Sequence, residues 1–252
     1  SDLEINDAEA TDLLIENHLS SSRWVTTPNR RLYDILSKKL DNVHLLPNGI
    51  EDQIYKSQPR RVGSMVVGWV GNPRDKEKQT KELLFPAVQK AGAKLLFTGV
   101  PVSRVKVARI YDKIDVLIIS SRSESQPLPM LEAMACGCFI ITTDVGVARE
   151  VVKNYQNGLI VRGVIDEIVS ALNWVNKNID VIRAGRQKRS AMFRKIRSWD
   201  CLANRFKIFF EFCLEELPPC SGVPHRSADT SGPSDNLEWD SYLCSSEEQD
   251  PA

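Results

Sequence analysis

Several features that mark particular classes of protein are missing from this sequence. Only three of its 252 residues are histidines, scattered along the chain, and no Asp-x-Asp pair follows a strand-like segment, so we expect no metal site. Lys plus Arg equal Asp plus Glu at 33 each, so no net field favours nucleic acid as a partner. No apolar run approaches the roughly 18 residues of a membrane-spanning helix.

Cysteine chemistry is also sparse. The six cysteines form no C-x-x-C pair, and Cys136 and Cys138 are too close for easy mutual bridging. We therefore expect buried, reduced thiols, which fits a reducing compartment such as the cytoplasm. The acidic start at Ser1 lacks the basic and apolar regions of a signal peptide, and no Met precedes it, so the numbering is expected to begin inside a longer protein.

What the chain does have is a regular alternation of β-branched and amphipathic segments. Strands are predicted at 23–27, 43–46, 65–70, 94–98, 116–120, 139–142 and 158–161, and helices at 8–19, 27–40, 79–91, 105–113, 128–135, 148–153, 165–176, 179–197 and 199–214. Thr27 is the predicted N-cap of the second helix, with Pro28 at its first position. Such alternation predicts an α/β fold, a Rossmann-like parallel sheet flanked by helices.

Composition divides the chain into three parts. Residues 1–50 resemble the edge of an α/β domain and end at the turn Pro47-Asn48-Gly49, and residues 51–216 form the main domain, which begins with a polar linker at 50–63. Residues 217–252 are rich in Ser, Pro, Gly, Asp and Glu, which predicts a flexible tail. An acidic-aromatic island at 237–243 can dock a partner or be part of a solvated tail.

The densest chemical signal is a pair of glutamates eight residues apart. Glu124 follows the apolar strand 114–120, and Glu132 lies early in the helix 128–135 that ends at Gly137. In open α/β sheets the crevice beyond the carboxyl ends of the strands is where ligands bind. Two carboxylates there can hold hydroxyl groups of one ligand.

The same crevice suits a phosphate. The loop 125–128 opens onto a helix N-terminus, where backbone N–H groups attract anions. Because Pro127 and Pro129 have no N–H, Gln126 and Leu128 are the candidate backbone donors. Gly71, after the first strand of the main domain, allows the backbone to approach a phosphate closely.

These residues carry a resemblance to a known family. The Glu124-x7-Glu132 spacing, with the segments 47–50, 68–72, 133–137, 139–146, 149–152 and 157–161 in the same order, resembles retaining GT-B glycosyltransferases, in particular glycosyltransferase family 4. The resemblance covers roughly residues 20–215. It implies the donor half of a GT-B fold, with a nucleoside diphosphate sugar as donor substrate, no separate cofactor and no metal ion.

The resemblance also implies roles for single residues. Glu124 faces the transferred sugar as the catalytic carboxylate, and Glu132 binds the ribose hydroxyls. A basic pair after the strand 65–70 clamps the diphosphate, for which Arg74 and Lys78 are our choice and Lys76 competes. Asn72 takes the place in which the family usually has Arg, and Ser125 replaces the usual glycine. The alternatives are an exposed charged turn for 76–81 and a helix-capping acid for Glu132.

The acceptor half of a GT-B enzyme is nearly all absent from the sequence, because residues 1–50 match only its last strand–helix–strand. Three explanations stay open: a fragment of a larger hexosyltransferase that retains anomeric configuration, one subunit of a split enzyme whose partner chain carries the acceptor half, or a non-catalytic binding module. The acceptor is unknown. A dinucleotide-binding domain is a weaker rival, because 68–71 do not complete G-x-G-x-x-G.

Overall fold

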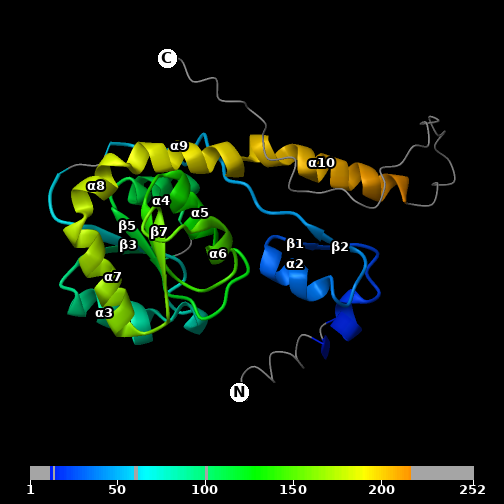
Figure 1. Ribbon diagram of the computed structural model, residues 1–252, viewed down its shortest axis with the longest axis horizontal. Coiled ribbons are helices and arrows are strands. Elements are labelled where there is room, and N and C mark those ends of the chain that lie inside the picture. Colours follow the sequence, from blue (N-terminus) through cyan, green and yellow to red (C-terminus); the bar gives the residue numbers. More distant parts are fainter. Residues whose placement is uncertain (1–11, 14, 60–61, 100–101, 217–252) are drawn as a thin grey trace, which may run out of the picture.

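The computed structural model describes residues 12–13, 15–59, 62–99 and 102–216, and its centre is a five-stranded parallel sheet of order β4-β3-β5-β6-β7 (Figure 1). The strands are β3 (Val66–Val70), β4 (Lys94–Thr98), β5 (Val116–Ile119), β6 (Phe139–Thr143) and β7 (Gly158–Val161). A separate parallel pair is formed by β1 (Val25–Thr27) and β2 (Val43–Leu45). The predicted fold class, a parallel sheet flanked by helices, is confirmed.

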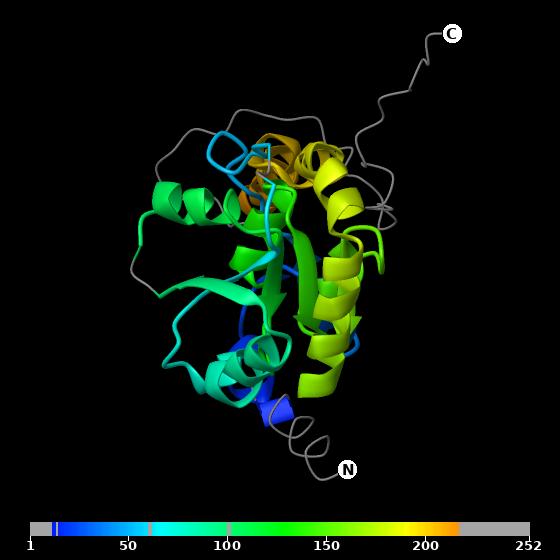
Figure 2. The same ribbon diagram turned by 90° about the vertical axis from the view of Figure 1, so that its left-hand side faces the viewer.

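Helices cover both faces of the large sheet (Figure 2). They are α3 (Phe85–Lys90), α4 (Arg104–Tyr111), α5 (Leu128–Ala135), α6 (Ala148–Val151), α7 (Ile165–Lys177), α8 (Ile179–Ala184) and α9 (Arg186–Arg197). The N-terminal part has the short α2 (Arg30–Leu36), and α10 (Trp199–Glu215) packs against that part. One core cluster packs α4, α5 and α9 against the sheet, and a second packs α3, α7 and α8 against the opposite face.

The two clusters follow from the period of two along each strand. In β5, Leu117 and Ile119 belong to the cluster under α4 and α5, whereas Val116 and Ile118 belong to the cluster under α3 and α7. All four side chains are buried, as expected for a strand covered on both faces. This continuous apolar run is why the sequence predicts β5 so clearly.

The N-terminal βαβ unit, residues 25–45, consists of β1, α2 and β2. Its helix begins later than predicted, since the N-cap is Asn29 and not Thr27. The Asn29 side chain accepts a hydrogen bond from the Leu32 backbone N–H at 2.8 Å, while Thr27 still belongs to β1. Asparagine satisfies a free N–H of the first turn as well as threonine does, and Thr27 is not available as a cap because it is the last residue of β1.

The predicted polar linker after this unit contains core residues. Ile50 and Tyr55 are each 3% exposed and belong to the cluster under α4 and α5. The Ile50 N–H donates to the Arg197 carbonyl, and the Ile50 carbonyl accepts from the Trp199 N–H. The segment that leaves the N-terminal part therefore lies beside the junction between α9 and α10. The description of 50–63 as a mere linker was therefore wrong for these two side chains.

Other boundaries differ in places where backbone geometry changes. The basic segment predicted as one helix at 179–197 breaks at Gly185, which separates α8 from α9, because glycine is a poor helix former. The helix predicted from Gln79 begins with a π-helical turn, Thr80–Leu84, before α3. Of the first predicted helix only the π-helical turn Ile15–Leu19 and residues 12–13 are described, and the predicted tail 217–252 lies outside the described residues.

Two further properties of the described residues concern membrane-spanning helices and cysteine thiols. None of their helices is long and apolar enough to cross a bilayer. Cys136, Cys138, Cys201 and Cys213 are free thiols. Burial raises the pKa of Cys136 and of Cys138, so both thiols stay protonated, as expected for packing residues.

The contact of β2 with α10 makes the stability of the N-terminal βαβ unit depend on pH. His44 lies against the rings of Phe209 and Phe212, at centroid distances of 5.0 and 5.6 Å. Burial lowers the pKa of His44, so the unfolded chain takes up a proton at a higher pH than the folded chain. Stability is therefore complete above the unfolded pKa of about 6.5 and falls as the pH drops below it.

We expect the melting temperature to fall between about pH 7.5 and about pH 5.5 by more in the wild type than in His44→Gln. Thermal melts of both proteins at matched ionic strength test this. His18→Gln serves as control, because this exposed histidine has no ring contact among those of the described residues. An equal fall in wild type and His44→Gln contradicts the prediction.

Candidate functional site

The candidate site lies where the chain changes direction in the large sheet. From β3 the chain passes to β4 on one side and then returns to place β5 on the other side, so β3 and β5 flank a topological switch point. Ligands of open α/β sheets bind at the carboxyl ends of such strands. Two loops leave the sheet there, the β3–α3 loop (71–79) and the β5–α5 loop (120–127).

An ion pair joins the two loops. The Lys78 ammonium contacts the Glu124 carboxylate, and both side chains are largely buried, with 24% and 15% of their surface exposed. The Ser121 hydroxyl donates to the same carboxylate at 2.8 Å. The structure therefore brings the predicted catalytic acid and one predicted phosphate-binding cation into contact.

Further bonds hold the β5–α5 loop in place. The Ser120 hydroxyl donates to the Lys78 carbonyl at 2.6 Å, and the Arg122 backbone N–H donates to the Glu77 carbonyl at 2.7 Å. From the next strand, the Thr143 hydroxyl donates to the Ser121 carbonyl at 2.5 Å. These three hydrogen bonds hold the two loops together, so the distance between Lys78 and Glu124 is fixed by the backbone around them.

The other residues predicted on the β3–α3 loop lie apart from this pair. Gly71 follows β3, and its N–H donates to the Thr98 carbonyl at 3.3 Å. The Asn72 side chain accepts from the Arg74 N–H at 3.1 Å, which forms a local turn. Arg74 is exposed, and no ion pair joins it to another described residue. A phosphate at this loop can still recruit Arg74, because its side chain faces solvent.

Glu132 occupies a different position, between α5 and α4. Its carboxylate accepts the Tyr111 hydroxyl at 2.8 Å, and Tyr111 itself is fully buried. Burial, reinforced by the adjacent Glu132 charge, raises the pKa of Tyr111 and of Tyr55, so both phenols stay protonated. Glu132 is thus held by a tyrosine from a neighbouring helix and does not cap α5.

The N-terminus of α5 is shaped by proline. Pro127 is the N-cap and Pro129 stands in the first turn, so the Leu128 N–H is directed toward the crevice end of the helix. Gln126 has a role that the sequence did not predict: its side chain is 8% exposed and accepts from the Asn48 N–H at 3.1 Å. The expected contact of Gln126 with a phosphate involves its backbone N–H, which this side-chain bond does not occupy.

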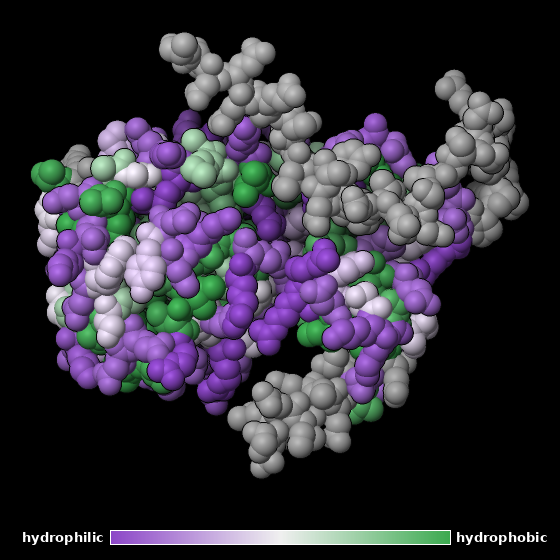
Figure 3. Space-filling model, in the orientation of Figure 1, coloured by the Kyte–Doolittle hydropathy of each residue, from purple (hydrophilic) through white to green (hydrophobic). Residues whose placement is uncertain are grey.

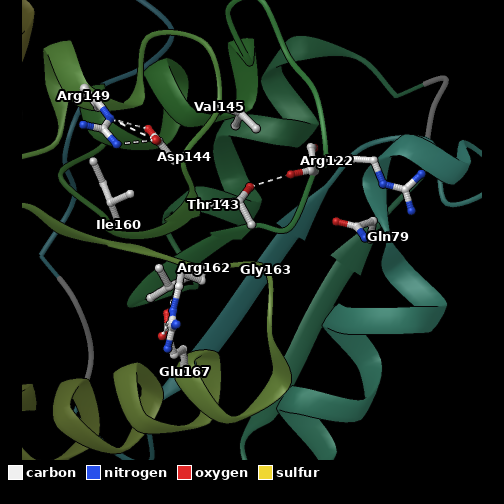
Figure 4. A pocket seen from close by; sticks show the side chains of 12 residues that line it. Gln79, Arg122, Thr143, Asp144, Val145, Arg149, Ile160, Arg162, Gly163 and Glu167 are labelled. Carbon is white, nitrogen blue, oxygen red and sulfur yellow. Dashed lines mark hydrogen bonds and ion pairs between the residues drawn. The ribbon is translucent and has the colours of Figure 1, made fainter. Parts of the chain in front are cut away.

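A shallow cavity of about 580 Å³ lies on the other side of the β5–α5 loop, beyond the ends of β5, β6 and β7 (Figure 4). Its charged walls consist of Arg122, Arg149, Arg162, Asp144 and Glu167. Figure 4 shows Arg149 directed at Asp144 and Arg162 at Glu167, so these charges compensate one another. We therefore place the candidate site at the switch point, where Lys78 and Glu124 are more enclosed.

The acids of this cavity are ionised at neutral pH. Hydrogen bonds from the Arg149 guanidinium, at 2.6 to 2.9 Å, lower the pKa of Asp144. The Arg162 backbone N–H, at 2.6 Å, lowers the pKa of Glu167, and the Arg162 side chain lowers it further. Both pairs are exposed and contribute little to stability.

The comparison that decides the family is a match over residues 60–192, just over half of the chain, to the family described as glycosyl transferases group 1. The chain belongs to this family. The matched region contains β3 through most of α9, and with it both loops of the switch point. The group 1 domain thus coincides with the large sheet and with the candidate site.

Curated relatives of this group 1 domain are enzymes of much greater length. It is 27% identical over 122 residues to a D-inositol 3-phosphate glycosyltransferase of Geodermatophilus obscurus, covering 48% of this chain and 26% of that protein. It is 32% identical over 95 residues to the enzyme of the same description from Rhodococcus erythropolis, covering 37% and 22%. The chain spans about a quarter of the length of these relatives.

Solved structures show the same architecture. Sucrose-phosphate synthase from Thermosynechococcus elongatus matches with a TM-score of 0.67 at 16% identity, covering 82% of this chain and 62% of that one. Anabaena HepE in complex with UDP and glucose matches with a TM-score of 0.62 at 15% identity, covering 76% and 64%. The group 1 domain therefore has the GT-B type of fold that the sequence predicted.

Sequence reasoning missed the residues that brace the site. Ser120 and Ser121 directly follow an apolar strand, which is a usable signal for polar groups at a sheet edge. Tyr111 and Asn29 gave no signal, because they reach Glu132 and the β5–α5 loop from elements far away in sequence. Long-range contacts of this kind arise only from the tertiary fold.

Proposed function

We propose that this group 1 glycosyltransferase binds a nucleoside diphosphate sugar at the switch point and transfers its hexose with retention of anomeric configuration. The observation that carries the proposal is the contact between Lys78 and Glu124 across the two loops. A cation and an acid at one point suit a donor whose phosphates and sugar hydroxyls are adjacent. Family membership supports a transferase.

In this proposal the diphosphate competes with Glu124 for Lys78. Lys78, Arg74 and the Leu128 N–H at the N-terminus of α5 stabilise the negative charge that develops on the leaving diphosphate. Glu124, released from part of its ion pair, accepts hydrogen bonds from hydroxyls of the transferred sugar. Gly71 and Asn72 lie at the end of β3, where the backbone can approach the phosphates.

Retention implies that the acceptor attacks from the face of the leaving group. A β-phosphate oxygen then takes the acceptor's proton as the bond between the anomeric carbon and that phosphate's bridging oxygen breaks. Lys78 and Arg74 replace a divalent ion as counter-charges, so metal-independent transfer is part of the proposal. A product of inverted configuration would rule out this mechanism.

We further propose that residues 1–50 are the end of an acceptor-type domain, 51–216 the donor domain and 217–252 a tail. The acceptor site then belongs to a further segment or to a partner chain, since this chain spans about a quarter of its curated relatives. A non-catalytic nucleotide-sugar-binding module is the alternative, which Ser125 in place of glycine favours. The free thiols fit a cytoplasmic location.

Calorimetric titration with UDP, GDP and their glucose and mannose conjugates tests the proposal. UDP-glucose is the first donor to try, because the similar HepE structure contains UDP and glucose. We expect micromolar binding that Glu132→Ala abolishes and that Glu215→Ala, a change at an exposed acid on α10, leaves intact. Binding that NAD displaces and sugar nucleotides do not would refute a sugar-nucleotide site.

Tyr111→Phe is expected to reduce discrimination between ribose and deoxyribose. The substitution removes the donor that holds one Glu132 oxygen at 2.8 Å, so the carboxylate loses its fixed orientation toward the ribose hydroxyls. Hydrogen bonds to charged groups stabilise by about 1.5–3 kcal/mol, so UDP affinity should fall about tenfold or more while 2′-deoxy-UDP affinity changes less. Tyr155→Phe, at an exposed tyrosine, is the control. Equal losses for both nucleotides contradict a role in ribose binding.

A further inference from the structure

One buried side chain connects the N-terminal βαβ unit to the candidate donor site. Asn29 is 1% exposed, and its Nδ2 donates to the Ser125 carbonyl at 2.8 Å and contacts the Ser125 hydroxyl at 3.3 Å. Its Oδ1 accepts from the Leu32 N–H at 2.8 Å. Both ends of the amide are therefore used, one inside α2 and the other on the β5–α5 loop 96 residues away.

On its other side, the β5–α5 loop packs against the backbone of Gly146. Gly146, after β6, has φ +50°, and a Cβ there would lie 2.1 Å from the Ser125 carbonyl oxygen. The Ser125 peptide is thus enclosed between the Gly146 backbone and the Asn29 amide. A carbonyl held from two sides fixes the plane of the peptide that joins Ser125 to Gln126.

The junction around Asn29 depends on polar contacts. The Gln126 side chain accepts from the Asn48 N–H, and the Glu150 carboxylate accepts from the Arg30 N–H at 2.8 Å. On the face seen in Figure 3, the side chains at the boundary between the two units are mostly hydrophilic. Directional hydrogen bonds of this kind fix the register of two surfaces more strictly than apolar packing does.

We infer that Asn29 is a positioning residue that sets the conformation of the β5–α5 loop for donor binding. The inference rests on the proposed function, since it concerns the same site. Glu124 precedes the bound peptide and Leu128 follows it by three residues, so a shift of Ser125 moves the sugar-binding acid relative to the phosphate-binding N–H. The N-terminal βαβ unit thereby contributes to donor affinity without touching the donor.

Asn29→Asp separates this role from helix capping. Aspartate keeps an oxygen for the Leu32 N–H, and aspartate caps helices as well as asparagine does, but it places a second oxygen against the Ser125 carbonyl. Asn204→Asp is the matched control, because it makes the same chemical change at an exposed asparagine of α10, away from the loop. Hydrogen–deuterium exchange of the Arg122 and Met130 amides, whose hydrogen bonds to the Glu77 and Pro127 carbonyls lie at the two ends of the loop, and titration with UDP and GDP are measured for both variants and for wild type.

We expect exchange at these amides to accelerate about tenfold or more in Asn29→Asp and UDP or GDP affinity to fall about tenfold. The melting temperature should also fall, because the new carboxylate is buried without a partner for one of its oxygens, so both measurements are made well below the melting transition of the variant. Asn204→Asp should resemble wild type. Unchanged exchange in Asn29→Asp overturns the inference, as does faster exchange with unchanged affinity. Wild type that binds neither nucleotide refutes the proposed function separately, and the exchange result then still decides whether Asn29 holds the loop.

Discussion

Lys78→Ala is expected to weaken the binding of a nucleoside diphosphate by about a hundredfold. The Lys78 side chain is only 24% exposed, so its charge acts on a phosphate through a medium of lower effective dielectric than bulk water. Two unit charges about 4 Å apart then interact by about 3 kcal/mol, between the values for water and for a protein surface. That energy corresponds to about a hundredfold in the dissociation constant.

The loss has a second component that a double variant isolates. Without Lys78, the Glu124 carboxylate stays in place and repels the incoming diphosphate. Lys78→Ala/Glu124→Gln should therefore bind UDP about tenfold more tightly than Lys78→Ala alone, although Glu124→Gln by itself removes a sugar contact. Such a recovery is not expected if Lys78 and Glu124 act on separate ligands.

Isothermal titration with UDP at low and at physiological salt provides the measurement. Lys81→Ala is the matched control, because it removes the same charge from an exposed position three residues away and should alter affinity by less than about threefold. If Lys78→Ala changes affinity no more than Lys81→Ala does, the phosphates are bound elsewhere and the Lys78–Glu124 pair is a structural ion pair.

The centre of the large sheet was predictable from the sequence because β5 and β6 are buried on both faces. Every residue of Val116–Ile119 and Phe139–Thr143 is buried, and all of them are aliphatic, aromatic or threonine. The bounds of α5, 128–135, follow from a run of Leu, Met and Ala that lies between Pro127 and Gly137. Boundaries failed where one residue could serve two elements. Thr27 is an example, since a strand and a helix cap both favour threonine.

The site was predictable only in outline. The spacing of Glu124 and Glu132 placed one acid in a loop and the other on a helix, and the structure shows both positions. Neither the Lys78–Glu124 contact nor the Tyr111 bond to Glu132 could be predicted, because each joins elements that only the sheet order brings together. Side-chain partners over such distances are properties of packing and not of local pattern.

A largely buried ion pair lies at the amino ends of the strands, opposite the candidate site. The Asp115 side chain is fully buried and pairs with Arg183 of α8 through contacts of 2.9 and 3.0 Å, and the Arg183 side chain is 13% exposed. Asp115 Oδ2 also accepts from the Val66 N–H at 2.9 Å, at the start of β3. One carboxylate therefore connects the starts of β3 and β5 to α8. The side-chain hydrogen bonds to Asp115 raise the pKa of Arg183, so the guanidinium stays charged.

Asp115→Ala should lower the free energy of unfolding by about 3–5 kcal/mol, because it leaves the largely buried Arg183 and the Val66 N–H without this partner. Asp166→Ala is the matched control: it breaks an ion pair with Lys90 of 2.6 Å, but the two side chains are 80% and 59% exposed, so a loss of at most about 1 kcal/mol is expected. Urea denaturation gives both values. Since Asp115 lies at the amino ends of the strands, the folded Asp115→Ala variant should bind UDP as the wild type does. A loss from Asp115→Ala no larger than that from Asp166→Ala would mean that α8 is held without this ion pair, by its apolar contacts and by the hydrogen bonds from Arg183 to the Gly63 and Ser64 carbonyls.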